Sequence, residues 1–163
     1  MTHILTTGGT IEGLEYPYER DKPKHSPIDI ENFLKPANVS FQYKIDKIFD
    51  KDSRFITDED RRVLSEKIKS SNANKILITH GTLTMVETAK FLGKMNLDKT
   101  IILTGALVLG TNANTDAHFN LGFAISALRF LDKGTYVAMN GNIFDWNNIK
   151  KNLQTNQFET LSK

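Results

Sequence analysis

Short, continuously apolar runs alternate with longer amphipathic segments along this chain, and this alternation restricts the possible folds more than any other feature. The clearest runs are 75–79 (KILIT) and 100–104 (TIILT). Neither run alternates polar with apolar residues, which is typical of strands that helices cover on both faces. Runs 3–6 and 136–139 have the same character, whereas segment 39–49 alternates in part and predicts a more exposed edge strand.

The amphipathic segments between these runs predict helices over 57–69, 84–94 and 116–131. Thr57 and Thr84 each begin a capping-box pattern, although aspartate stands where glutamate or glutamine is usual in the first. Val63, Leu64 and Ile68 are expected to form the inward stripe of the first helix. Each of these helices would therefore pack one face against the predicted sheet.

Strands that alternate with helices through short connections predict βαβ units and right-handed crossovers. We expect one α/β domain over residues 1–163, Rossmann-like or flavodoxin-like, with a mainly parallel sheet flanked by helices and no second domain. A segment without clear periodicity, 14–27, would be a lid, a binding loop or a disordered stretch. The polar tail from Asn147 onward would wrap over the domain or fray.

Composition excludes several classes of function. The chain has no cysteine, which rules out disulfides, thiolate metal ligands and a cysteine nucleophile. Its net charge of +2 comes without a long basic run, which argues against nucleic acid as the main partner. No apolar stretch approaches the roughly 20 residues that a membrane span needs, and no signal peptide is recognisable. We therefore expect a cytoplasmic protein that binds neither membrane nor nucleic acid.

Small polar turns follow three of the predicted strands, at 6–10 (TTGGT), 80–82 (HGT) and 105–106 (GA). Ligands of open α/β sheets bind beyond the carboxyl ends of the strands, so these turns predict one shared crevice. Thr10 is the best candidate nucleophile, and the amides of Gly8 and Gly9 are candidates for stabilising an oxyanion. Thr82 is a second candidate.

Other polar residues near these turns have simpler interpretations. Lys99, just before the third buried strand, is a candidate base, although composition alone favours a solvated lysine. His80 is interpreted as a residue that holds its loop by hydrogen bonds, and Asp116 and Asn120 as helix-capping residues. The histidines lack ligand spacing, so no metal site is expected. No glycine-rich phosphate loop pattern is present either.

The polar turns belong to two longer patterns, TTGGTI at 6–11 and ITHGTLTMVETA at 78–89. These patterns resemble the signatures T-G-G-T-I and T-H-G-T-D-T-M-x-E-T-A of the bacterial-type asparaginase family, which uses a threonine nucleophile. Shorter elements match in the same order: DS with IT at 52–57, DK at 98–99 before the strand ending in GA, and D with FNL at 116–121.

The resemblance implies an amidohydrolase that needs no metal or organic cofactor. The threonine that matches Thr10 attacks the side-chain amide carbonyl of the substrate and is acylated, and ammonia leaves before water regenerates the threonine. A tyrosine of the following loop, here Tyr16 or Tyr18, helps to activate it. The second threonine matches Thr82 and works with an aspartate and with the lysine that matches Lys99.

The resemblance also implies a site for a small amide substrate, formed by Gly9, Ser53, Gly81 and the residue after Thr82. Ser53 matches the serine that helps to hold the α-carboxylate. The residue after Thr82 is an aspartate in the family, where it binds the α-ammonium, but it is Leu83 here. Family members also carry a smaller C-terminal domain that completes the neighbouring subunit's site. We therefore expect a homodimer or higher homo-oligomer.

Three hypotheses follow from these departures. The first is an asparaginase-like hydrolase of L-asparagine or a related amide. The second is a hydrolase of an amide without an α-amino group, which Leu83 would accept. The third is a non-catalytic small-molecule binding domain on the same scaffold, which both departures favour.

Overall fold

The apolar runs of the sequence form the parallel strands of one sheet in the computed structural model, which describes residues 1–16 and 26–161. Within these residues six strands are joined in the order β2-β1-β3-β4-β5-β6. They are β1 (Thr2–Thr6), β2 (Tyr43–Lys47), β3 (Lys75–Thr79), β4 (Thr100–Thr104), β5 (Gly134–Met139) and β6 (Asn142–Asp145). Only β6 runs antiparallel to its neighbour. The mainly parallel α/β fold is confirmed, with β2 at an edge as expected.

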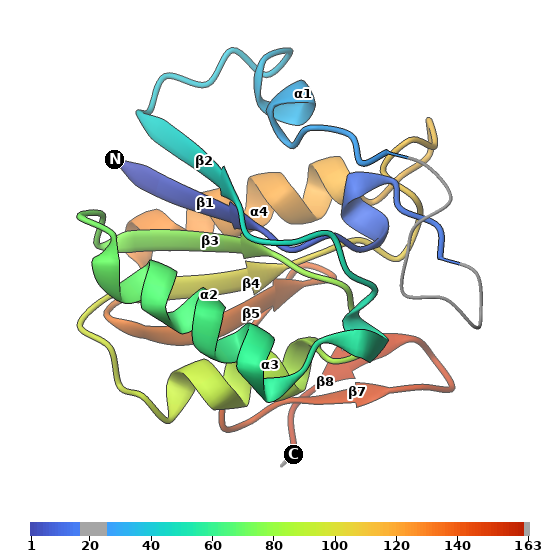
Figure 1. Cartoon of the computed structure of the whole chain (residues 1–163). Coiled ribbons are helices and arrows are strands. Elements are labelled where there is room, and N and C mark those ends of the chain that lie inside the picture. The colour runs from blue at the N-terminus through green and yellow to red at the C-terminus, as the bar shows by residue number, and fades with distance from the viewer. Residues whose placement is uncertain (17–25, 162–163) are drawn as a thin grey trace.

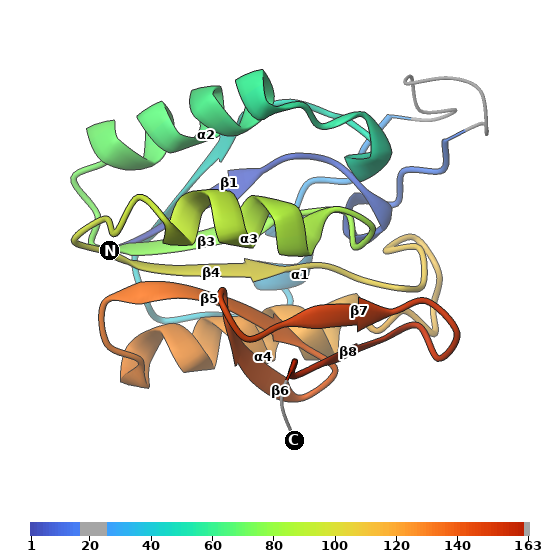
Figure 2. The same ribbon diagram turned by 90° about the horizontal axis from the view of Figure 1, so that it is seen from below.

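Helices cover both faces of the sheet. The helices α2 (Asp58–Ser70) and α3 (Met85–Gly93) lie on one face, and α1 (Glu31–Leu34) and α4 (Ala117–Phe130) lie on the other (Figures 1 and 2). Alternate residues of β3 enter the two cores, because Ile76 and Ile78 pack toward α2 and α3 while Leu77 packs toward α4. This two-sided burial explains the continuously apolar strands.

The first long helix begins as the sequence predicts. The Thr57 side chain accepts a hydrogen bond from the amide of Asp60, and the Asp60 carboxylate accepts one from the amide of Thr57. The inward stripe was predicted wrongly in one position, because Val63 is 51% exposed whereas Leu64 and Ile68 are buried. Arg61 is the buried residue one turn before Leu64, as a period of 3.6 residues requires.

After β5 the chain forms a hairpin and then continues to the end of the sheet at which the parallel strands terminate. Asn140 and Gly141, with φ angles of 54° and 76°, connect β5 to β6, and these are the residues that a tight hairpin prefers. A separate antiparallel pair follows, β7 (Lys150–Asn152) and β8 (Gln157–Glu159). The flanking Ile149 and the β8 residue Phe158 are buried in the core on the α2 and α3 face. The tail therefore wraps over the domain.

No helix within residues 1–16 and 26–161 has both the length and the hydropathy that crossing a membrane requires.

Candidate active site

The turns that follow β1, β3 and β4 lie against one another at the carboxyl edge of the sheet, toward which these strands all point (Figure 1). A Cβ atom at Gly9 would lie 2.8 Å from the Cα atom of Gly81, so the first two turns are in backbone contact. A Cβ atom at Gly105 would overlap the carbonyl oxygen of His80, which brings in the third turn. The three turns are therefore adjacent, as the sequence predicts, but only the first two line the cavity described below.

The first turn presents Thr10 at the start of a short 3-10 helix, Thr10–Glu12. Gly8 and Gly9 precede it with φ angles of 93° and 91°, a conformation that L side chains rarely adopt. The Thr10 carbonyl accepts hydrogen bonds from the amides of Gly13 and Gly110. Thr10 also lines the small cavity described below.

The backbone amides of this turn are less available as donors to an oxyanion than the sequence suggests. The Gly8 amide donates a 2.8 Å hydrogen bond to Oε1 of Glu12, so it cannot serve as an oxyanion donor in this arrangement. The Gly9 amide donates to the hydroxyl of Tyr16 at 3.4 Å. Glu12, a residue without a predicted role, therefore takes up the Gly8 amide.

Tyr16 lies over the glycine turn, and Tyr18 lies outside the described residues. Apart from the contact with Gly9, the Tyr16 hydroxyl would be 2.9 Å from a Cβ atom at Gly8. Burial raises the pKa of Tyr16 above its ordinary value, even though the hydrogen bond from Gly9 lowers it. Tyr16 is therefore a neutral phenol at physiological pH, placed within reach of the Thr10 turn.

The second turn holds Thr82, and its closest charged partner is a lysine that the sequence analysis missed. Lys151, on β7, donates a 2.8 Å hydrogen bond from Nζ to the hydroxyl of Thr82. Burial lowers the pKa of Lys151 below its ordinary value. A lysine with a lowered pKa carries a larger fraction of neutral amine, which is the form that accepts protons. Thr82 and Lys151 can therefore exchange a proton directly.

Lys99 does not join this group. Lys99 immediately precedes β4, so it lies at the amino-terminal end of this strand. The turns follow the carboxyl-terminal ends, and the five-residue length of β4 separates them from Lys99. Its Nζ atom donates hydrogen bonds to the carbonyl oxygens of Ser71 at 2.7 Å and Ala73 at 2.8 Å. The prediction that Lys99 acts as a base at the site is therefore wrong, because its side chain cannot extend along the strand from one end to the other.

Ser53 supports the second turn. Its hydroxyl accepts a 3.2 Å hydrogen bond from the amide of Leu83, and its carbonyl accepts a 2.6 Å hydrogen bond from the hydroxyl of Thr84. Thr84 therefore does not cap α3 with its side chain, contrary to the capping-box prediction. A Cβ atom at Gly81 would lie 2.8 Å from Ser53 Oγ, so only glycine fits beside this serine.

A cavity of about 80 Å³ lies between these groups. Its walls are formed by Gly9, Thr10, Tyr16, Asp52, Ser53, Gly81, Thr82 and Leu83. Leu83 is 48% exposed at this cavity. Of the expected site residues that the structure describes, Gly8 and Lys99 are not among these walls. Within the described residues, no group of three or more histidine, aspartate or glutamate side chains is arranged to hold a metal ion.

His80 holds the second turn from behind. Its Nδ1–H donates to the carbonyl of Gly81 at 2.7 Å, and its Nε2 atom lies 2.9 Å from the hydroxyl of Thr88. Burial lowers the pKa of His80 to about 4, so the ring is neutral at pH 7. Thr88 also accepts from Arg61, which leaves the hydroxyl proton of Thr88 for Nε2. His80 is thus a loop-holding residue, as the sequence suggests, and not a base.

Asp116 and Asn120 hold the third turn, and Asp116 does not cap its own helix. The carboxylate of Asp116 accepts hydrogen bonds from the amides of Leu107 and Val108, and it makes no side-chain cap at α4. The side-chain amide of Asn120 donates to the carbonyl of Gly105 at 3.1 Å and to Asp116 at 2.8 Å. The two residues fix the loop after β4 because its backbone amides have no strand partner there.

Comparisons with known proteins identify the family of this chain. The family model "Asparaginase, N-terminal" matches residues 2–163. The chain is 35% identical to a glutaminase-asparaginase of Acinetobacter glutaminasificans, over 95% of this chain and 51% of that protein. It is 29% identical to L-asparaginase 2 of Escherichia coli, over 91% of this chain and 45% of that protein. The chain thus spans about half the length of these curated relatives.

Solved structures show the same relationship. A probable cytoplasmic L-asparaginase from Campylobacter jejuni superimposes with a TM-score of 0.83 at 29% identity, over 99% of this chain and 53% of that chain. The thermostable L-asparaginase from Thermococcus kodakarensis gives a TM-score of 0.85 at 26% identity, over 99% of this chain and 51% of that chain.

Proposed function

Since this chain belongs to the asparaginase family, matching the family's N-terminal domain over residues 2–163, we propose that it releases ammonia from a small carboxamide through the nucleophile Thr10. The observation that carries this proposal is the hydrogen bond between Lys151 and Thr82, because it supplies a proton acceptor at the cavity that Thr10 lines. Acyl transfer requires a nucleophile with a proton acceptor nearby, and Thr10 and the Thr82–Lys151 pair would take these two roles.

In the proposed reaction the Thr10 oxygen attacks the amide carbon, and the Thr10 proton passes through the Thr82 hydroxyl to the neutral amine of Lys151, while the neutral Tyr16 phenol stays a hydrogen-bonding group at the turn. The tetrahedral intermediate collapses when the carbon–nitrogen bond breaks, and the nitrogen takes up a proton and leaves as ammonia. Water then attacks the acyl-threonine ester, which releases the carboxylic acid and restores the Thr10 hydroxyl. No metal or organic cofactor is needed for either step.

The substrate class follows from the side chains around the cavity. Ser53 is proposed to contact the carboxylate of the substrate, as the family resemblance implies. Leu83 offers no negative charge to an α-ammonium group, and an ammonium brought against it loses hydration without gaining a partner. We therefore propose that a carboxamide without the α-amino group, such as succinamate, is hydrolysed at least as well as L-asparagine.

Ammonia release by the purified protein tests this function, with L-asparagine, L-glutamine and succinamate as substrates. We expect release from at least one of them, with the highest kcat/KM for succinamate. If the folded protein releases ammonia from none of the three, the hydrolase proposal fails and the non-catalytic binding domain replaces it. Binding of the same three compounds, followed by calorimetry, then tests that replacement.

Replacing Leu83 with aspartate is expected to raise kcat/KM for L-asparagine relative to succinamate by about tenfold or more, because a charge-assisted hydrogen bond to the α-ammonium is restored. The ratio of the two kcat/KM values is the measurement. Leu153→Asp is a matched control, since Leu153 is also exposed but lies outside the cavity. An unchanged ratio in Leu83→Asp would show that this position does not face the α-substituent.

We also propose that the working form is a homo-oligomer, since the exposed Leu83 leaves the cavity open on one side in a single chain. Sedimentation velocity on the active protein tests this, and an active monomer would contradict it. The cytoplasmic location expected from the sequence stays a prediction, because one relative is named as cytoplasmic and another as periplasmic.

A further inference from the structure

The side chain of Glu12 packs against the turn that contains Thr10. The residue is 2% exposed, and its Oε1 atom accepts hydrogen bonds from the Gly8 amide at 2.8 Å and from the Thr79 hydroxyl at 3.0 Å. The backbone amide of Glu12 donates to the carbonyl of Gly9 at 3.1 Å. One residue therefore binds the glycine turn on two sides and ties it to the end of β3.

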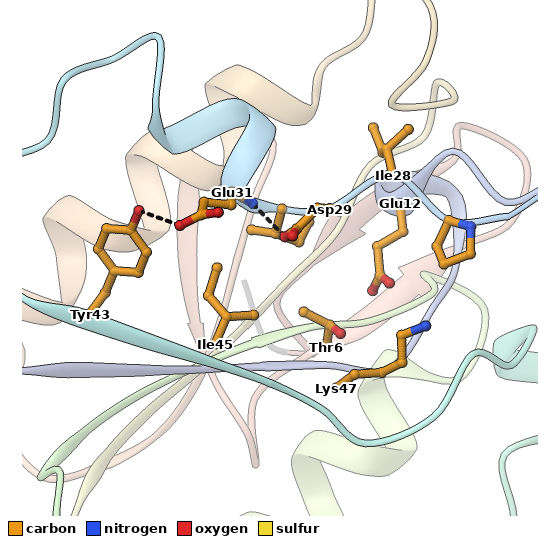
Figure 3. Close-up of a pocket in the computed structure, with 10 residues that line it drawn as sticks. Thr6, Glu12, Ile28, Asp29, Glu31, Tyr43, Ile45 and Lys47 are labelled. Carbon is orange, nitrogen blue, oxygen red and sulfur yellow. Dashed lines mark hydrogen bonds between the residues drawn. The ribbon is translucent and has the colours of Figure 1, made fainter.

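A second cavity lies on the far side of this turn. Its volume is about 510 Å³, and it lies between β2 and the segment 27–31. Figure 3 shows the Glu12 carboxylate pointing into this cavity, toward Thr6 and Lys47. Within the described residues, no hydrogen bond to the Oε2 atom of Glu12 is found. The carboxylate thus has one oxygen committed to the turn and one directed to a space that solvent can enter.

We propose that Glu12 is a positioning residue, whose carboxylate holds residues 8–10 in the conformation that presents the Thr10 hydroxyl to the amide. This inference rests on the proposed function for the role of Thr10. Glu12 does not line the small cavity at Thr10 and Thr82, so it acts through the Gly8 amide and not by touching the substrate. Gly8 has a positive φ of 93°, and its amide has its acceptor in the Glu12 side chain.

The protonation state of Glu12 determines how strongly its carboxylate binds the Gly8 amide. Burial raises the pKa of Glu12 to about 7, although the bonds from Gly8 and Thr79 lower it. The other charged groups near it act in both directions, since Asp50 raises its pKa and Lys47 lowers it. Further titratable groups are Tyr16 at the turn and Asp29, Glu31 and Tyr43 around the second cavity.

The ionised carboxylate is the stronger acceptor for the Gly8 amide. The turn is therefore held more tightly above pH 7 than below it. A neutral Glu12 keeps Oε1 as a weaker acceptor and directs its proton into the second cavity. Glutamine reproduces this neutral form, because its Oε1 accepts the same two hydrogen bonds without titrating.

Four variants test the proposal. Glu12→Ala removes the acceptor, Glu12→Gln keeps a neutral acceptor, and Thr79→Val removes only the link to β3. Glu66→Gln, an exposed glutamate on α2, is the matched control. The measurements are hydrogen exchange and chemical shift of the Gly8 amide by NMR, together with kcat and KM for the best amide substrate.

In Glu12→Ala we expect Gly8 exchange to rise and kcat to fall by about tenfold or more each, as the loss of one hydrogen bond to a charged group implies. KM should change by less than about threefold, because the substrate cavity keeps its lining. Glu12→Gln should recover most of both losses, and Thr79→Val should show a smaller change. The wild-type Gly8 shift should titrate near pH 7, and this titration should be absent in Glu12→Gln.

Several results would overturn the proposal. A Gly8 amide that is as protected in Glu12→Ala as in the wild type would do so, and so would a Gly8 shift that titrates in the same way in the wild type and in Glu12→Gln. Glutamine keeps both hydrogen bonds, so this comparison decides the question even if Glu12→Ala fails to fold. If the wild type hydrolyses no amide, the proposed function fails, whereas the exchange and shift measurements still report on Glu12.

Discussion

Replacement of Thr10 by alanine is expected to lower the rate of ammonia release by about three orders of magnitude or more, the effect typical of removing a nucleophile. In the proposed reaction Thr10 supplies the attacking oxygen, whereas Thr82 passes the proton to Lys151. The fold should be unaffected, since the hydrogen bonds at this position use the backbone carbonyl of Thr10, which alanine retains. Initial rates of ammonia release and the thermal unfolding midpoint are the two measurements.

Thr10→Ser is the matched control for this experiment. Serine keeps a hydroxyl at the same position and should retain a measurable part of the activity, whereas alanine should not. Full activity in Thr10→Ala, with the unfolding midpoint unchanged, would remove Thr10 from the mechanism. The non-catalytic hypothesis makes a different prediction, since neither variant would then change a rate that is already zero.

Replacing Lys151 with methionine is expected to lower kcat/KM by about 100-fold or more, the range for losing a group that transfers protons. Methionine keeps the apolar stem but cannot donate to or accept from the Thr82 hydroxyl. The wild-type rate should rise with pH as Lys151 loses its proton, and it should do so below the ordinary lysine range because burial lowers the pKa of Lys151. The pH dependence of kcat/KM, compared between wild type and Lys151→Met, is the measurement.

Two other lysines make this experiment specific. Lys150→Met changes the neighbouring residue, whose Nζ atom lies 3.6 Å from Glu159 on the exposed side of the hairpin, and it should be nearly silent. Lys99→Met should keep the activity and lose about 1–3 kcal/mol of stability, because Nζ of Lys99 holds two backbone carbonyls. If Lys99→Met lost activity in a folded protein while Lys151→Met kept it, the assignment would be reversed.

The sheet was largely predictable from the sequence because its strands are buried on both faces. Two-sided burial leaves continuous apolar runs, and the limits predicted for β3 and β4 are those of the structure. Helix positions were also predictable, but the inward face of α2 was less so. Val63 is apolar and adjacent to Leu64, so its side chain alone suggests burial. The rotation of the helix about its axis instead buries Arg61 and exposes Val63.

The polar turns of the site were predictable because each follows a buried strand, but their side-chain partners were not. Lys151 lies in a polar tail and reaches Thr82 across 69 residues, a contact that no local pattern encodes. A signal was available, since two buried apolar residues, Ile149 and Phe158, flank and anchor this segment. Glu12 was missed for a related reason, since a glutamate two residues after a nucleophile is expected to be solvated unless the fold is known.

The attachment of Lys151 to the β7–β8 hairpin has a consequence for how the active form arises during synthesis. Residues 1–104 contain the Thr10 turn, the Thr82 turn and four parallel strands, and they leave the ribosome before the lysine does. An early folded intermediate would therefore contain the proposed nucleophile but lack its proposed proton acceptor until the hairpin docks. Activity should thus report on docking of the β7–β8 hairpin, and local opening of that hairpin would switch activity off without global unfolding.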